Sequence, residues 1–581
     1  MNPATVRMTR REREVLVELC RPSLVPAAFV EPTTTRAIAQ SLFVSEAAVK
    51  QHLLRLYDKF ELYQGGDNRR LALANLALER GLVSQVDLGA ADPGSAAAPP
   101  RPSDSLPQEI LEGRLALARR EWRSAFEALV GPYKGGDLTA ADDLAALGEA
   151  ALWAGEIRVS QEARRRAYAQ YLAGEDERGA AVVALGLVIN YAARVKFAVA
   201  GGWLAKARRH VESLPEGREH ALLAAIEGLV LVLGGDLDDG DLRSRAAIDL
   251  GRRYGDRDAV AIGLAFRGCV LTHRKRLAEA RAMFDEAMAT ATAGELGPLA
   301  TGLVYCRTIC TCIDVFDYER AHEWTQVVEE THRAILEGGF PGDCRAHRAT
   351  ILAMQGEWAS AEEEARIACD ESALFDLVHT GIATYEIGEL RMGAGDLDAA
   401  DEAFRRATEL GHLGEPGVSL CSLARGKRDV AWSSITMALA GARNSPLARA
   451  KLLPAAIEIA AAVGDHMSVK AFAAELGATA HDFGSRTLEA HAQHARGSVE
   501  LLSGDADAAI QAFRQAVRLF SEIEAPYFAA RARFDLGKEL AAQHHIGPAV
   551  TELKAALATF ERVGARPDAR RSIDLLAELA G

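Results

Sequence analysis

The stretch GAGDLDAADEAFRRA, residues 393–407, decides the fold of most of this chain. Small residues stand at fixed intervals in and just before it, at Gly388, Gly395, Ala400 and Ala407, and one large apolar residue, Phe404, stands among them. Small residues at such spacing let two helices come into close contact, and a larger apolar side chain fills the gap beside them. The stretch therefore predicts a pair of helices joined by a short turn.

The same pattern returns along the chain at a nearly constant interval. Its contact position, Ala400 in the quoted stretch, recurs at residues 125, 160, 200, 240, 280, 321, 361, 400, 431, 469, 509 and 549. Most intervals are 39 to 41 residues, with exceptions of 35, 31 and 38, and only Val469 is not small. The spacings of the small residues within each copy are those of a tetratricopeptide repeat (TPR), and a period near forty, rather than about 34, implies longer helices or turns than the minimal repeat. We predict an all-α fold in which residues 108–581 form a TPR-like solenoid of about twelve helical pairs, with an extended concave surface and a final capping segment, Pro567–Leu579.

A second pattern lies near the start of the chain, in SLFVSEAAVKQHLLRLYDKF at residues 41–60. Ser45 can cap a helix here by accepting hydrogen bonds from its first amides. One apolar stripe then follows at helical spacing: Val49, Leu53, Leu56 and Phe60. The opposite side carries Lys50, Gln51, Leu54 and Arg55. The pattern predicts an amphipathic helix whose second face is available to a partner such as the major groove of DNA.

Three segments in this part resemble a known family. TRREREVLVELC (9–20), TTRAIAQSLFVSEAAVKQHLLRLYDKF (34–60) and LALANLALERGLV (71–83) are similar, in this order, to the LuxR/GerE-type helix-turn-helix domain. The resemblance implies a DNA-binding domain over residues 1–86, whose third helix enters the major groove of double-stranded DNA, and a possible homodimer on paired half-sites. It places Lys50, Gln51 and Leu54 nearest the base edges, with Ser45 capping that helix, and Arg36, Arg55 and Lys59 near phosphates. The sequence departs from the family in a longer loop at 21–34, in Ala48 and in Glu61.

Charge and composition both change near the end of this N-terminal part. Residues 87–107 are rich in Pro and Ala without periodicity, which predicts a linker. Residues 1–83 carry twelve Lys and Arg against nine Asp and Glu, and their net charge of +3 leaves −17 for the rest of a chain whose total is −14. The array is thus acidic, which excludes a second nucleic-acid surface or an anionic membrane surface and favours positively charged partners. The charged start, the short apolar runs and the absence of C-x-x-C predict a cytoplasmic protein with no membrane segment.

The remaining chain shows no motif of catalysis. Residues 110–565 resemble the helical arrays of large LuxR-type regulators, in stretches such as 293–310, 338–352 and 385–407. Those relatives often carry an ATPase module, but this sequence contains no G-x-x-x-x-G-K-[ST], and no G-x-S-x-G or H-E-x-x-H either. We interpret Cys306, Cys310 and Cys312 as buried packing residues, and His491 with His494 as a solvated or hydrogen-bonded pair. We predict no enzymatic activity, no catalytic residue, no metal and no cofactor.

Two functions fit these features. The first is a DNA-binding transcriptional regulator whose TPR-like array senses or recruits a peptide, a protein or a small ligand. The alternative is a TPR protein-interaction scaffold whose N-terminal helical domain does not bind DNA. Contact of Lys50 and Arg55 with nucleic acid separates the two.

Overall fold

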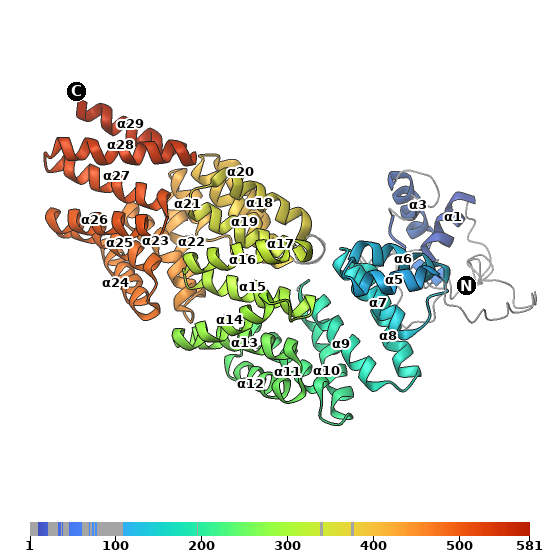
Figure 1. The fold of residues 1–581 in the computed structure, drawn as a ribbon. Helices are drawn as coiled ribbons and strands as arrows, with labels where there is room; N and C mark the ends of the chain where they lie inside the picture. Colours follow the sequence, from blue (N-terminus) through green and yellow to red (C-terminus); the bar gives the residue numbers. More distant parts are fainter. Residues whose placement is uncertain are drawn as a thin grey trace, which may run out of the picture. The chain divides into compact units, whose positions relative to one another are not determined.

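A computed structural model describes the array almost completely and the N-terminal part in segments (Figure 1). The described residues are 10–20, 33–35, 38, 46–60, 69, 73–74, 76–77, 108–194, 196–336, 341–372 and 377–580. All elements in these ranges are helical, which confirms the predicted all-α class. The chain divides into two compact units, 1–105 and 106–581. The predicted linker 87–107 lies outside the described residues.

The N-terminal unit is built on two described helices, α1 (Arg10–Cys20) and α3 (Glu46–Lys59). The apolar stripe of α3 is buried as expected, and it packs with α1 and with Ile38 and Leu73 in one cluster. Most of the two other predicted helices, 35–42 and 69–80, lies outside the described residues. The helix-turn-helix fold of residues 1–86 therefore stays a prediction.

The second unit consists of consecutive helix pairs, and its described part contains twelve of them, followed by α29 (Arg566–Ala580). The first helices of the pairs are α5 (Gln108–Ala118), α7 (Ala141–Trp153), α9 (Glu177–Ala192), α11 (Arg218–Leu233), α13 (Arg257–His273), α15 (Pro298–Asp314), α17 (Pro341–Met354), α19 (Leu377–Gly393), α21 (Gly417–Ala424), α23 (Pro446–Val463), α25 (Arg486–Ser503) and α27 (Pro526–Ala542). The second helices are α6 (Trp122–Gly135), α8 (Ile157–Ala173), α10 (Phe197–Glu212), α12 (Leu237–Tyr254), α14 (Leu277–Thr292), α16 (Tyr318–Leu336), α18 (Trp358–Ser372), α20 (Leu397–Glu409), α22 (Arg428–Gly441), α24 (His466–Phe483), α26 (Ala506–Glu522) and α28 (Ile546–Val563).

The small residues of the repeat mark the closest approach within each pair. A Cβ atom added to Gly388 would lie 2.5 Å from a ring carbon of Phe404, so only glycine admits that ring. Gly268 meets Phe284 and Gly497 meets Phe513 in the same way. Phe404 is fully buried, and burial of such a side chain contributes about 1.5–3 kcal/mol. The contact predicted from the glycine–phenylalanine spacing is confirmed.

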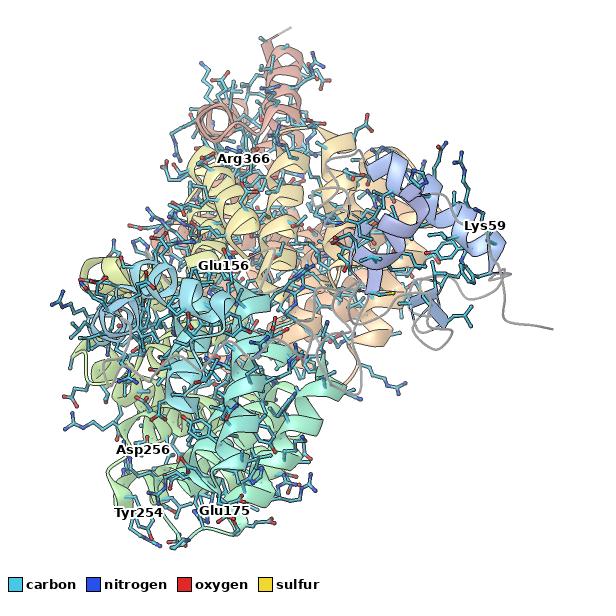
Figure 2. The ribbon with its side chains drawn as sticks, turned by 90° about the vertical axis from the view of Figure 1, so that its right-hand side faces the viewer. Lys59, Glu156, Glu175, Tyr254, Asp256 and Arg366 are labelled. Carbon is cyan, nitrogen blue, oxygen red and sulfur yellow. The ribbon has the colours of Figure 1, made fainter. Side chains whose placement is uncertain are left out.

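The turns are held by capping residues. Gly395 has a φ of +85°, a left-handed conformation that favours glycine. The carboxylate of the next residue, Asp396, accepts a hydrogen bond from the Ala399 amide at 3.2 Å and so caps α20. Asp256, one of the turn residues labelled in Figure 2, caps α13 through the Ala259 amide at 2.9 Å.

The irregular intervals of the sequence have structural causes. The interval of 31 residues between positions 400 and 431 spans α21, which has only 8 residues. The interval of 35 between positions 125 and 160 spans α7, with 13 residues. A shorter first helix brings the next contact position closer along the chain without breaking the order of pairs.

Pairs far apart in the sequence also meet within the second unit. Ser485 donates a hydrogen bond to the carbonyl of Phe316 at 3.4 Å, across 169 residues. Trp358 packs on Tyr527 with ring centroids 5.0 Å apart. A cleft of about 300 Å³ lies where the Phe316 turn meets the Phe483–Ser485 turn. Among the described helices, none has the length and apolar character needed to cross a membrane.

Candidate functional site

The predicted contact residues of α3 divide into those the structure describes and those it does not. Lys50, Gln51, Leu54, Arg55 and Lys59 are all exposed, opposite the buried stripe of the same helix. Leu54 is 55% exposed, so this face of α3 is not wholly polar. Lys59 is labelled in Figure 2. Arg36 and Ser45 lie outside the described residues, and DNA contact by any of the seven stays a prediction.

The second candidate site belongs to the array. Each odd-numbered helix packs on its even-numbered partner, and several odd-numbered helices carry polar side chains away from that contact. Hydrogen bonds and ion pairs join several of these side chains from helix to helix. We call them the odd-helix surface: Cys306, Arg307 and Asp314 of α15, His347 of α17, His379, Glu386 and Glu389 of α19, Lys451 and Glu458 of α23, His494 of α25, and Arg531 and Asp535 of α27.

Ion pairs connect distant helices across this surface. Lys451 donates to Asp314 at 2.7 Å although 137 residues separate them, and their side chains are 46% and 43% exposed. Burial raises the pKa of Asp314, but the charges of Lys451 and Arg307 outweigh it and hold the pKa below its usual value. Arg531 pairs with Glu458 at 2.7 Å, and its charge lowers the pKa of that carboxyl. These pairs are satisfied within the chain.

Glu386 and Glu389 differ from the other acids of the surface. Glu386 accepts a hydrogen bond from the Thr350 hydroxyl at 3.0 Å, and Glu389 accepts one from the Tyr385 hydroxyl at 2.6 Å. No salt bridge among the described residues includes either carboxyl. Burial, together with the charge of Glu389, raises the pKa of Glu386 to about 7, and burial also raises that of Glu389. The two carboxyls thus form an acidic pair that lacks a counter-charge within the described array.

Three potential metal ligands meet on the same surface. The ligand atoms of Cys306, His347 and His379 all lie within 4.8 Å of one another. His347 is 2% exposed, and neither of its ring nitrogens has a hydrogen-bond partner among the described residues. Leaving such a group unsatisfied costs about 1–3 kcal/mol. Burial, then the neighbouring His379 and Arg307, hold the pKa of His347 well below its ordinary value, so its imidazole is neutral.

The histidines and cysteines singled out from the sequence have other surroundings. His494 bonds to Asp535 at 2.8 Å, which confirms a hydrogen-bonded side chain. His491 is not its partner in a site, because its ring packs between Phe520 and Phe528 with centroids 4.9 Å from each. Cys306 faces His379, its Sγ lying 3.4 Å from Nε2, whereas Cys312 is buried as predicted.

The sequence held a signal for this surface that our prediction missed. Residues seven apart lie on the same face of a helix. Arg307 and Asp314, His379 and Glu386, and Lys451 and Glu458 are three such polar pairs, one on each of three odd-numbered helices. Polar residues at this spacing beside a packed apolar face mark a helix that turns one side away from its partner.

Comparison with known proteins supports the repeat. Residues 490–522, which include most of α25 and all of α26, match the family described as tetratricopeptide repeat. No curated protein matches the chain. Similar solved structures include the APC/C hetero-tetramer Cut9–Hcn1, at 14% identity over 80% of this chain and 96% of that chain, with a TM-score of 0.34. Yeast Tom70 is similar at 13% identity over 81% of this chain and 95% of that chain, with a TM-score of 0.24.

Proposed function

We propose that the chain is a protein-interaction scaffold whose odd-helix surface binds a segment of a partner protein. We further propose that Glu386 and Glu389 receive a lysine or arginine side chain of that segment. The observation that carries this is the pair of carboxyls without a counter-charge, held on a helix of an array that contains a tetratricopeptide repeat. Stacked helical repeats offer extended surfaces to partners, and the proposal includes no catalytic step.

The chemistry of the pair favours a cation. Both carboxyls are ordered by hydrogen bonds from hydroxyls, so a ligand finds them already positioned. Their raised pKa values record the cost of holding negative charge there without compensation. A bound ammonium or guanidinium group removes that cost and gains two charge-assisted hydrogen bonds.

The other charged groups of the surface have a different role. Asp314 is already paired with Lys451, and Glu458 with Arg531. These pairs connect α15 to α23 and α23 to α27, so they hold helices of the same surface together. The net charge of −17 outside the first 83 residues acts in the same direction, because it attracts a basic segment from a distance.

Partner capture by variants tests the proposal. The full-length chain is tagged and purified from its own cells as wild type, as Glu386→Gln with Glu389→Gln, and as the control Glu402→Gln with Glu409→Gln. The control removes the same charge from the exposed side of α20. Loss of one partner of a hydrogen-bonded charge pair typically costs 2–5 kcal/mol or more, so we expect affinity to fall by about 30-fold or more. The captured partner is also cross-linked to the chain, and the cross-linked residues are identified. If all three proteins captured the partner equally and cross-linked it to α19 equally, the assignment would be refuted.

A second function rests on α3 alone. The exposed Lys50, Gln51, Leu54 and Arg55, on a helix whose other face is buried, are what the LuxR/GerE-type resemblance requires of a recognition helix. We propose on this basis that the chain also acts as a cytoplasmic transcriptional regulator, as a monomer or a homodimer. Genomic DNA fragments are offered to the full chain, to Lys50→Ala with Arg55→Ala, and to Arg405→Ala with Arg406→Ala as the charge-matched control. Binding that is the same in all three leaves the scaffold as the function.

A further inference from the structure

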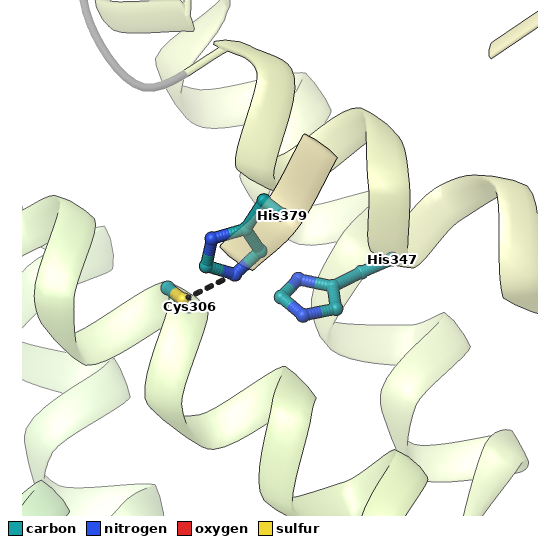
Figure 3. A group of neighbouring side chains, drawn as sticks. All are labelled: Cys306, His347 and His379. Carbon is teal, nitrogen blue, oxygen red and sulfur yellow. Dashed lines mark hydrogen bonds between the residues drawn. The ribbon is translucent and has the colours of Figure 1, made fainter. Parts of the chain in front are cut away.

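Three side chains from three successive odd-numbered helices converge at one point of the array (Figure 3). Cys306 comes from α15, His347 from α17 and His379 from α19. We propose that they bind one Zn²⁺ ion, with the Cys306 sulfur and one nitrogen of each imidazole as ligands. This site is independent of the partner segment proposed above and needs neither Glu386 nor Glu389.

The distances suit a tetrahedral ion. With Zn–N of about 2.0–2.1 Å and Zn–S of about 2.3 Å, two ligand atoms of one zinc lie roughly 3.3–3.6 Å apart. The Cys306 Sγ and the His379 Nε2 are already 3.4 Å apart. All ligand atoms lie within 4.8 Å of one another, so the third has to move by no more than about 1–1.5 Å, which rotation of an imidazole ring supplies.

His347 is the strongest reason to expect a ligand. It is buried, and both of its nitrogens lack a hydrogen-bond partner among the residues that the structure describes. Buried polar groups in proteins nearly always have a hydrogen-bond partner or a metal, so the unprotonated ring nitrogen of His347 is expected to have a partner that accepts its lone pair. A metal ion is such a partner, and a neutral imidazole is the form that binds it.

The donor set selects the metal. One thiolate with two imidazoles is typical of Zn²⁺ among common divalent ions, whereas Mg²⁺ and Ca²⁺ require oxygen ligands. Three protein ligands leave the fourth position of the tetrahedron for water. When the metal binds, the Cys306 thiol loses its proton to solvent, and the thiolate brings one negative charge to the site. The neighbouring residue in the chain, Arg307, carries a positive charge that opposes cation binding. Asp314, which lies 3.7 Å from Arg307, partly offsets that charge.

The competing explanation is a purely structural cluster. In it, the Cys306 thiol and His379 share a hydrogen bond and His347 only packs edge-on against His379, with ring centroids 5.2 Å apart. That arrangement gives no reason for metal affinity, and it predicts that a metal ion leaves the reactivity of Cys306 unchanged.

Metal titration of the full-length chain tests the proposal. Protein freed of metal with a chelator is titrated with Co²⁺ and then with Zn²⁺, and thiolate ligation is read from the charge-transfer band of Co²⁺. We expect one ion per chain, displaced by Zn²⁺. Cys306→Ser and His347→Ala each weaken binding by about 100-fold or more, beyond the 10–100-fold typical of second-shell changes. Cys369→Ser, on α18, leaves it unchanged.

A measurement on the unaltered chain covers the case in which a variant fails to fold. Alkylation of each cysteine is followed by peptide mass spectrometry with and without Zn²⁺. We expect Zn²⁺ to slow alkylation of Cys306 strongly and that of Cys369, a half-buried cysteine of α18, not at all. Absence of the thiolate band, undiminished binding by Cys306→Ser, or equal alkylation of Cys306 with and without Zn²⁺ would overturn the proposal.

Discussion

Replacing Gly497 by alanine should loosen one helix pair, because the new methyl group has no room. Gly497 lies on α25 against Phe513 of α26, and an added Cβ would lie 2.7 Å or less from three of its ring carbons. The Phe513 ring has little room to move away from the new methyl group. Phe513 is 1% exposed, and it packs with Ile510, Leu536 and Leu540 in one buried cluster.

The magnitude follows from two opposing effects. Forcing a methyl group into a packed core typically costs about 1–3 kcal/mol, and contacts this short place the cost near the upper end. Alanine favours the helical conformation over glycine by about 0.5–1 kcal/mol, and this offsets part of the cost. We therefore expect Gly497→Ala to destabilise the α25–α26 pair by about 1–2 kcal/mol. A long repeat array does not unfold as one unit, so the effect has to be measured locally.

Hydrogen exchange of peptides from α25 and α26 is the appropriate measurement. A loss of about 1–2 kcal/mol accelerates exchange by about 5–30-fold. The control is Gly477→Ala in the neighbouring α24, where an added Cβ meets nothing within 4 Å and where we expect slower exchange. Adding Phe513→Leu to Gly497→Ala should restore part of the loss. If both glycine variants slowed exchange equally, the argument that close contact requires glycine here would be refuted.

Three further predictions concern charge. The pKa of Glu386 in the folded state is raised to about 7, so the stability that this group contributes is present below about pH 4.5 and is lost as the pH rises through 7. Melting curves at pH 5 and pH 8 should show this loss, and Glu386→Gln should reduce the difference between the two curves. Burial lowers the pKa of His491 to about 3, so its contribution is present above about 6.5 and is lost as pH falls toward 3; His491→Phe should remove that part of the acid sensitivity. A double-mutant cycle with Lys451→Met and Asp314→Asn should give a coupling free energy between the two side chains of about 0.2–1 kcal/mol, because both are nearly half exposed. A coupling above about 2 kcal/mol would show that solvent screens this ion pair less than its exposure implies.

The repeat could be predicted from the sequence because its determinants are local. Phe404 faces Gly388 within one pair, so a short stretch of sequence contains both residues of the contact and the interval between them. The same holds for the twelve contact positions, all of which lie on even-numbered helices and are buried. Even the interval of 31 residues, irregular in the sequence, reflects only the short α21.

The candidate sites could not be predicted in the same way, because their members are distant in the chain. Cys306 and His379 are 73 residues apart, and Asp314 and Lys451 are 137 apart. Which odd-numbered helices lie side by side depends on the rotation between successive pairs, and that rotation is the sum of many small packing differences. From the sequence we therefore singled out Cys306 but neither His347 nor His379, the two histidines that meet it.

The two helices of each pair are under different constraints, and this explains where function can arise. An even-numbered helix contributes the buried contact residue, which is small in eleven of the twelve pairs. An odd-numbered helix satisfies its partner with one face only, as the seven-residue spacing of His379 and Glu386 on α19 shows. Its second face can exchange residues at little cost to the fold. α17 uses that face for His347, whose ring nitrogens lack a partner among the described residues, and α19 uses it for two carboxyls without a counter-charge. Satisfied or apolar groups would serve the fold better, so stability alone does not account for the choice of residues there.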